Sequence, residues 1–150
     1  MKISLKYGLA ITAVVIAWIV IVRIVMGVGA DSRANMIGPI IFNVVAVAAI
    51  FLGIIRRKDE VGGELSFKEG LKTGLGISFV YAASSCLFFL IYQLVAGPGL
   101  LMTEAGATER PLWQTAVGAY IGLFFGSLIL GLIYSTLISF FLAKRRSESR

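Results

Sequence analysis

Four long apolar stretches dominate the pattern of hydrophobic and polar positions along this 150-residue chain, and they run over residues 7–28, 36–55, 71–95 and 116–143. Each is long enough to cross a hydrocarbon core of about 30 Å as a helix rising 1.5 Å per residue. Strands of a lipid-facing barrel alternate apolar and polar residues over about 10 positions, whereas these stretches are continuously apolar. The pattern therefore predicts an all-α fold, a transmembrane four-helix bundle of two antiparallel hairpins, in a single integral membrane domain over residues 1–150.

The links between the stretches contain turn and capping signals. The first link, residues 29–35, is short enough for an antiparallel helical hairpin. The second link is charged, has a break at Gly62-Gly63, and ends in Ser66-Phe67-Lys68-Glu69. This last run matches a capping box, in which Ser66 is the N-cap and Glu69 reaches back to its amide. The third helix is therefore expected to begin near Phe67.

Composition supports a membrane protein and argues against an enzyme. Hydrophobic residues make up 58% of the chain and charged residues 15%, against about 45–50% and about 25% in soluble domains. The chain has no histidine, and its one cysteine, Cys86, lies within an apolar stretch. Its serines therefore lack an obvious activating base, and Gly62-Gly63 does not match a phosphate-binding loop. We expect no catalytic residues, no metal site and no cofactor.

The distribution of basic residues predicts the orientation in the membrane. The net charge is +6, and 11 of the 14 Lys and Arg residues fall on one side of the predicted bundle. Basic residues near span ends are retained in the cytoplasm, so both termini and the second link are expected to be cytoplasmic. The residues expected at the membrane surface are Arg56, Arg57, Lys58, Lys68, Lys72, Lys144, Arg145 and Arg146.

These basic residues are expected to face anionic lipid headgroups, where each contributes about 1 kcal/mol. Binding to nucleic acid explains them less well, because they are divided among short segments at span ends. The lipid bilayer is therefore the expected partner, and no nucleic acid is expected.

The first stretch has a competing interpretation as a secretory signal. Lys2 and Lys6 precede an apolar run, and Val28-Gly29-Ala30 offers small residues at a cleavage-like position. However, the run exceeds the 7–15 residues of a signal core, and Arg23 interrupts it just before the cleavage-like position. Cleavage would also place the basic second link and the basic tail on opposite faces of the membrane. We therefore expect the first helix to be retained.

Small residues at intervals of four form two stripes that favour close helix packing. In lipid, helices associate where small residues let their backbones approach. The expected packing residues are Gly70, Gly74 and Ser78 on the third helix and Gly118, Gly122 and Gly126 on the fourth. Two interpretations remain open. The stripes pack the four helices within one chain, or one stripe, more readily that of the fourth helix, forms a homodimer contact.

The polar residues inside the apolar stretches are few and uncharged except for one arginine. The apolar stretches contain no Asp or Glu, the residues on which proton-coupled transport usually relies. Arg23 lies near the outer end of the first helix, where it can snorkel to the interface or bind an anion or Asp31. Asn43 is positioned for a hydrogen bond across helices, worth about 0.6–2 kcal/mol. Tyr81 and Gln93 are candidates for a polar seam, although Tyr92-Gln93 near a span end also fits an interfacial belt.

The segment 51–72, FLGIIRRKDEVGGELSFKEGLK, is the most distinctive part of the chain. Its basic loop, followed by a Ser-Phe element entering the third helix, resembles the signature of the bacterial domain of unknown function 4199 family. The opening Lys6-Tyr7-Gly8-Leu9 and the four spans are similar too. The chain departs from that pattern at Glu69-Gly70, where the family has a small residue followed by an aromatic one. The resemblance implies a four-span inner-membrane protein without assigned activity.

Two functional hypotheses follow from these features. The first is a non-catalytic structural or assembly component that associates with itself, as a homodimer, or with a larger membrane complex. The alternative is a small transporter or channel subunit for a neutral or anionic solute, with Asn43, Tyr81 and Gln93 facing a shared cavity.

Overall fold

The computed structural model describes residues 2–25, 33–96 and 112–143, and every element in these ranges is helical. The elements are α1 (Lys2–Ile19), the π-helical segment η1 (Val20–Val25), α2 (Arg33–Glu60), α3 (Phe67–Ala96) and α5 (Leu112–Leu142). The predicted all-α fold is confirmed.

All four long helices are apolar enough to cross a membrane. The candidate spans are Lys2–Val22, Ile37–Glu60, Phe67–Val95 and Ala116–Leu142. At the charged second link the helices extend beyond the apolar stretches, because α2 continues to Glu60 and α3 begins at Phe67. Helices continue through charged residues where long side chains reach the interface. The end of the first predicted stretch, residues 26–28, lies outside the described residues.

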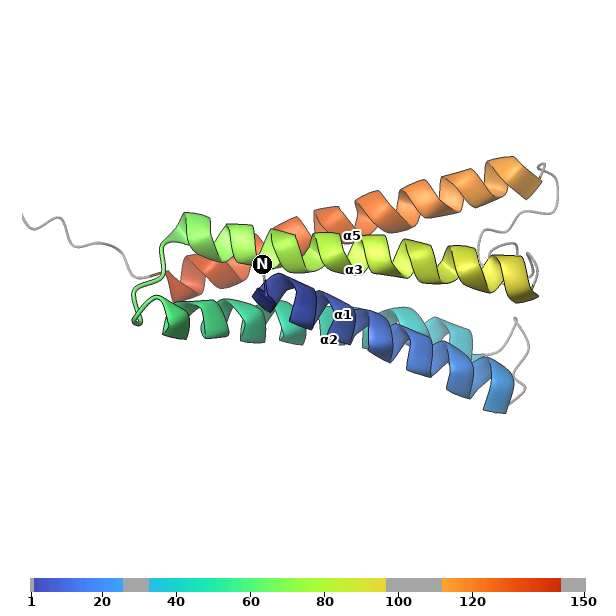
Figure 1. Ribbon diagram of the computed structural model, residues 1–150, viewed down its shortest axis with the longest axis horizontal. Coiled ribbons are helices and arrows are strands. Elements are labelled where there is room, and N and C mark those ends of the chain that lie inside the picture. Colours follow the sequence, from blue (N-terminus) through green and yellow to red (C-terminus); the bar gives the residue numbers. More distant parts are fainter. Residues whose placement is uncertain (1, 26–32, 97–111, 144–150) are drawn as a thin grey trace, which may run out of the picture.

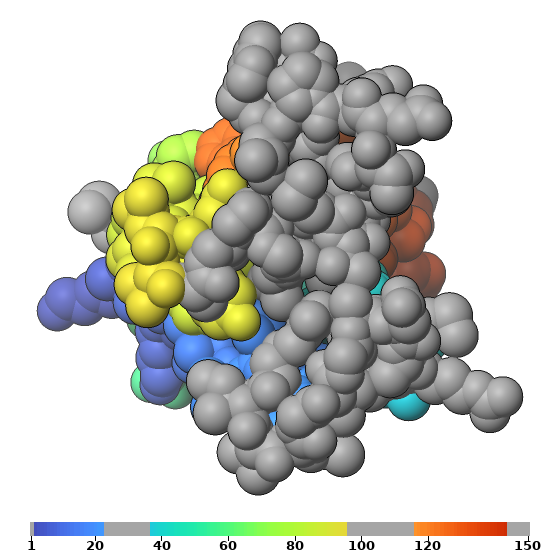
Figure 2. Space-filling model, turned by 90° about the vertical axis from the view of Figure 1, so that its right-hand side faces the viewer, coloured from blue at the N-terminus to red at the C-terminus, as the bar shows by residue number. Residues whose placement is uncertain are grey.

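Consecutive helices run in opposite directions along the bundle, and α3 contacts each of the other three long helices (Figure 1). Figure 2 views the bundle from the end opposite the α2–α3 link, with the last turns of α3 in yellow. The links at 26–32 and 97–111 lie outside the described residues. The two-hairpin arrangement therefore remains a prediction.

The α2–α3 link has the predicted capping box and glycine break. The Glu69 backbone N–H donates to Ser66 Oγ at 3.3 Å, and the Ser66 N–H donates to Glu69 Oε2 at 3.3 Å. Gly62 and Gly63 have φ values of +77° and +89°, which residues with a Cβ rarely adopt. The turn therefore requires these glycines, and α3 begins at Phe67 as predicted.

Small residues bring α3 and α5 together in a seam of three pairs, which we call the glycine–serine seam. A Cβ added to Gly70 would meet Ser139, one on Gly74 would meet Ser135, and one on Gly131 would meet Ser78. The sequence interval is four in every case, so successive pairs lie one helical turn apart. Ser135 and Ser139 are fully buried. Backbone proximity thus holds the two helices together where large side chains would separate them.

The other helix contacts in this half of the bundle are equally close. A Cβ on Gly8 of α1 would lie 2.6 Å from Cβ of Val80 on α3. One turn further along α1, the Thr12 and Ser84 hydroxyls share a hydrogen bond of 2.6 Å. Ile50, Ile54, Leu65 and Ile77 form the buried core beside these contacts. The half of the bundle that includes the α2–α3 link is therefore tightly packed.

Toward the opposite end, α1 and α5 diverge (Figure 1). The described parts of α1 and α5 make no extensive contact with each other, and α3 lies between them. The helices that the glycine–serine seam holds close in one half therefore enclose a cavity in the other.

Candidate functional site: an intramembrane cavity

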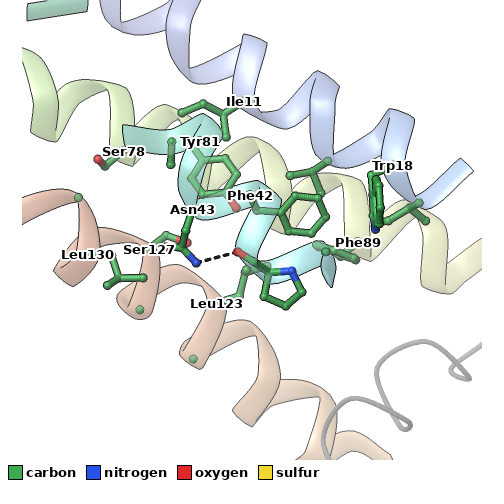
Figure 3. A pocket seen from close by; sticks show the side chains of 18 of the residues that line it. Ile11, Trp18, Phe42, Asn43, Ser78, Tyr81, Phe89, Leu123, Ser127 and Leu130 are labelled. Atoms are coloured by element: carbon green, nitrogen blue, oxygen red, sulfur yellow. Dashed lines mark hydrogen bonds between the residues drawn. The ribbon is translucent and has the colours of Figure 1, made fainter. Parts of the chain in front are cut away.

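A cavity of about 500 Å³ is lined by all four long helices (Figure 3). It extends from the middle of the bundle, at Ile11, Ile50 and Gly131, toward the splayed end at Trp18 and Phe89. Ligand pockets in proteins typically measure about 300–1,000 Å³. The space is therefore large enough for a ligand of the size of a drug molecule.

Most of the cavity wall is apolar and aromatic. The aromatic residues that line it are Trp18, Phe42, Tyr81, Phe89, Tyr120 and Tyr134. None of the lining residues within the described parts of the chain carries a charge. An ion would lose its hydration in such a space without a compensating partner, which costs several kcal/mol. The cavity is suited to an uncharged occupant.

Asn43 provides the principal polar group on the α2 side of the cavity. Its Nδ2 donates to the Pro39 carbonyl oxygen at 2.8 Å, one turn earlier in the same helix (Figure 3). Its Oδ1 accepts from the Tyr134 hydroxyl of α5 at 3.0 Å. The expected hydrogen bond of Asn43 across helices is thus present. It joins α2 to α5 near the inner end of the cavity and fixes the amide orientation.

The other polar residues singled out in the sequence occupy different positions. Tyr81 lines the same cavity as Asn43 (Figure 3). Gln93 does not line it, but its Oε1 accepts a hydrogen bond of 2.9 Å from the hydroxyl of Tyr120, which does. Arg23 belongs to η1, and its side chain lies outside the described residues. Two of these four residues therefore share one site.

The stripe at Gly118, Gly122 and Gly126 does not make the close helix contacts that packing within one chain would require among the described residues. No described atom lies within 4 Å of a Cβ placed on any of the three. Gly122 and Gly126 line the cavity, whereas Gly118 is exposed outside it. The α5 residues that pack against α3 are Gly131, Ser135 and Ser139. The glycines in the N-terminal half of α5 thus have open space beside them, whereas the serines in its C-terminal half pack against α3.

Three polar residues of α5 that line the cavity were not identified as candidates from the sequence, namely Tyr120, Ser127 and Tyr134. They recur at intervals of seven, which places them on one face of a helix. This spacing within an uncharged span was the signal that could have identified a polar face.

The basic residues at the α2–α3 link are exposed or engaged in local contacts. Arg56, Lys68 and Lys72 are exposed. Arg57 lies 3.5 Å from Glu60 and 3.8 Å from Glu69, in exposed pairs that contribute about 0–1 kcal/mol.

Lys58 makes a different contact, because its Nζ donates to the Leu142 carbonyl at 3.2 Å at the end of α5. A lysine there satisfies an unpaired terminal carbonyl and favours the negative end of the helix dipole. Lys144, Arg145 and Arg146 lie outside the described residues.

Metal-ligating side chains are not gathered in the parts of the chain that the structure describes. No group of three or more His, Cys, Asp or Glu side chains is positioned there to hold a metal ion. Cys86 is half-buried, and its Sγ lies 4.0 Å from the Tyr120 carbonyl oxygen between α3 and α5.

The chain belongs to the family described as "Protein of unknown function (DUF4199)", whose model matches residues 6–144. This match confirms the resemblance carried by segment 51–72 and extends it over almost the whole chain. No curated protein and no solved structure matches the chain.

Proposed function

We propose that this protein is a non-catalytic component of a bacterial cytoplasmic membrane that acts by associating with another membrane helix through α5. Both termini and the α2–α3 link face the cytoplasm in this proposal. The excess of Lys and Arg at that end of the bundle supports the orientation, through the retention of basic residues in the cytoplasm.

The exposed glycine-bearing face of α5 carries the proposal. In the most apolar window of α5 only 6% of the residues are buried, against 28–33% in the other three spans. Gly118 and Gly122 are exposed on this helix, and no described atom lies within 4 Å of a Cβ on either. Gly118, which lies outside the cavity, offers lipid no side-chain contacts, whereas a second helix can approach its backbone closely.

Crosslinking in native membranes tests this association. We expect Gly118→Leu to lower the yield of a specific crosslinked species about tenfold, because leucine holds the partner backbone away. Val117→Leu is the matched control, since Val117 is also exposed on α5 but lies off the ridge. Gly122→Leu is less informative, because Gly122 also lines the cavity. Equal crosslinking of the wild type and both variants would contradict the proposal.

A second candidate function, a small transporter or channel subunit, is favoured by a separate observation. Asn43 and Tyr81 are two of the three residues that this hypothesis places in a shared cavity, and they line the same space, whereas Gln93 does not. The described lining residues are uncharged, which favours a neutral solute over an anionic one.

Solute flux into reconstituted vesicles tests this second candidate. If the protein conducts solutes, we expect glycerol to enter faster than into protein-free vesicles and nitrate to enter no faster. Asn43→Leu should reduce the glycerol rate about tenfold, because the entering solute loses its hydrogen-bonding amide, and Val117→Leu should not. Light scattering of osmotically shrunken vesicles gives the rates. Glycerol entry equal to that of protein-free vesicles would exclude transport of this solute class.

A further inference from the structure

The polar groups of the cavity have hydrogen-bonding capacity beyond their bonds to one another. An asparagine amide has two N–H donors and an oxygen with two acceptor positions. The bond from Asn43 to Pro39 uses one donor, and the bond from Tyr134 uses one acceptor position. The amide therefore retains one donor and one acceptor position, and the Tyr134 oxygen retains acceptor capacity. An occupant with a hydroxyl or carbonyl oxygen can use these positions.

The remaining wall of the cavity favours an apolar body. Trp18, Phe42 and Phe89 line the cavity toward its splayed end (Figure 3). The Trp18 indole packs closely against the α2 backbone, because a Cβ added to Gly38 would lie 3.0 Å from Trp18 Nε1. Aromatic rings in a cavity wall contribute large apolar contact areas. The polar end of an occupant therefore belongs at Asn43 and Tyr134, and its apolar body beside Trp18.

We propose that this cavity is a binding site for an uncharged amphiphile, with a hydroxyl or carbonyl oxygen at Asn43 and Tyr134 and an apolar body against Trp18 and Phe42. Two features select this class. The described lining residues carry no charge, so an ionic headgroup at the deep end would lose its hydration without a compensating partner. The Asn43–Tyr134 pair favours an oxygen-bearing molecule over a hydrocarbon chain, which would leave the remaining donor and acceptor positions of the pair without a partner. The site does not depend on the association of α5.

Trp18 provides a direct reporter of occupancy. The chain has two tryptophans, Trp18 and Trp113, so Trp113→Phe leaves Trp18 as the only one. Bromine quenches indole fluorescence on contact, and three brominated probes of equal chain length differ only at the head. They are 11-bromoundecanol, 11-bromoundecanoate at pH 8, and 1-bromoundecane. Titrations in detergent are corrected for the measured partition of each probe into micelles.

The alcohol is expected to quench Trp18 saturably, with an affinity about tenfold higher than that of the carboxylate or the alkane. Asn43→Leu and Tyr134→Phe should each reduce the alcohol affinity toward that of the alkane, by about fivefold to tenfold, and the second variant preserves the shape of the site. Val117 lies outside the cavity, and Val117→Leu should leave the affinity unchanged. Linear, unsaturable quenching by all three probes would overturn the proposal. Equal affinities, or the tightest binding by the carboxylate or the alkane, would also overturn it.

Discussion

Gly131→Leu is expected to lower the free energy of unfolding by about 3 kcal/mol, the upper part of the usual range for overpacking. Gly131 is buried, and even a Cβ at this position would overlap the side chain of Ser78. Relief requires α5 to move away from α3, which also separates Ser135 from Gly74 and Ser139 from Gly70. The cost is therefore shared by all three pairs of the glycine–serine seam. Reversible unfolding in mixed micelles, followed by tryptophan fluorescence, measures it.

Two further variants separate close packing from a general effect of leucine in α5. Gly118→Leu introduces the same side chain where no described atom lies within 4 Å of the Cβ, so its unfolding free energy should stay within about 0.5 kcal/mol of the wild type. Gly131→Ala should destabilise the fold, and adding Ser78→Gly should recover most of that loss, because it removes the overlapping atoms. Equal stability of the Gly131→Leu and Gly118→Leu variants would show that the seam does not hold α3 against α5.

The four helices could be predicted from the sequence because length and continuous hydrophobicity determine a membrane span. The start of α3 at Phe67 was predictable for a local reason. Ser66 and Glu69 satisfy each other's backbone N–H groups regardless of the rest of the fold. Such signals depend on residues three or four positions apart, which a sequence displays directly.

The partner of the α3 stripe was harder to predict, because it depends on the rotation of α5 about its own axis. Counting glycines singled out Gly118, Gly122 and Gly126. The residues that meet α3 are Gly131 and two serines, Ser135 and Ser139, which are also small enough for close approach. The two sets lie on different faces of one helix. Hydrophobicity does not choose between them, because lipid covers either face equally well.

The cavity could be predicted only in part. Asn43 and Tyr81 were recognisable as polar residues within apolar stretches, and they line the same space. Tyr120 and Tyr134 were missed because aromatic residues in a span resemble ordinary packing residues or interfacial anchors. Their role depends on the divergence of α1 from α5, which arises from the tertiary arrangement (Figure 1). A cavity is a property of how helices tilt, and no single helix encodes it.

Gly126→Phe is expected to weaken the binding of 11-bromoundecanol at least thirtyfold while leaving the fold intact. Gly126 lines the cavity, and a Cβ there would meet no described atom within 4 Å. A phenyl ring can therefore enter space that a ligand would otherwise occupy without displacing the helices. The same substitution at Gly118, two turns earlier on α5 and outside the cavity, adds equal apolar surface and should leave probe affinity unchanged.

The expected combination of results for Gly126→Phe is opposite to that for Gly131→Leu. Both replace a glycine of α5 by a large apolar residue, yet the first should abolish saturable quenching of Trp18 with little change in unfolding free energy, and the second should destabilise the bundle. Quenching is measured in the Trp113→Phe background, and unfolding is measured on the same samples. If Gly126→Phe binds the probe as the wild type does, the bromine contacts Trp18 from surrounding detergent rather than from the cavity. If it unfolds as readily as Gly131→Leu, the helices are already in contact at this level, and the space between α2 and α5 is closed in the membrane.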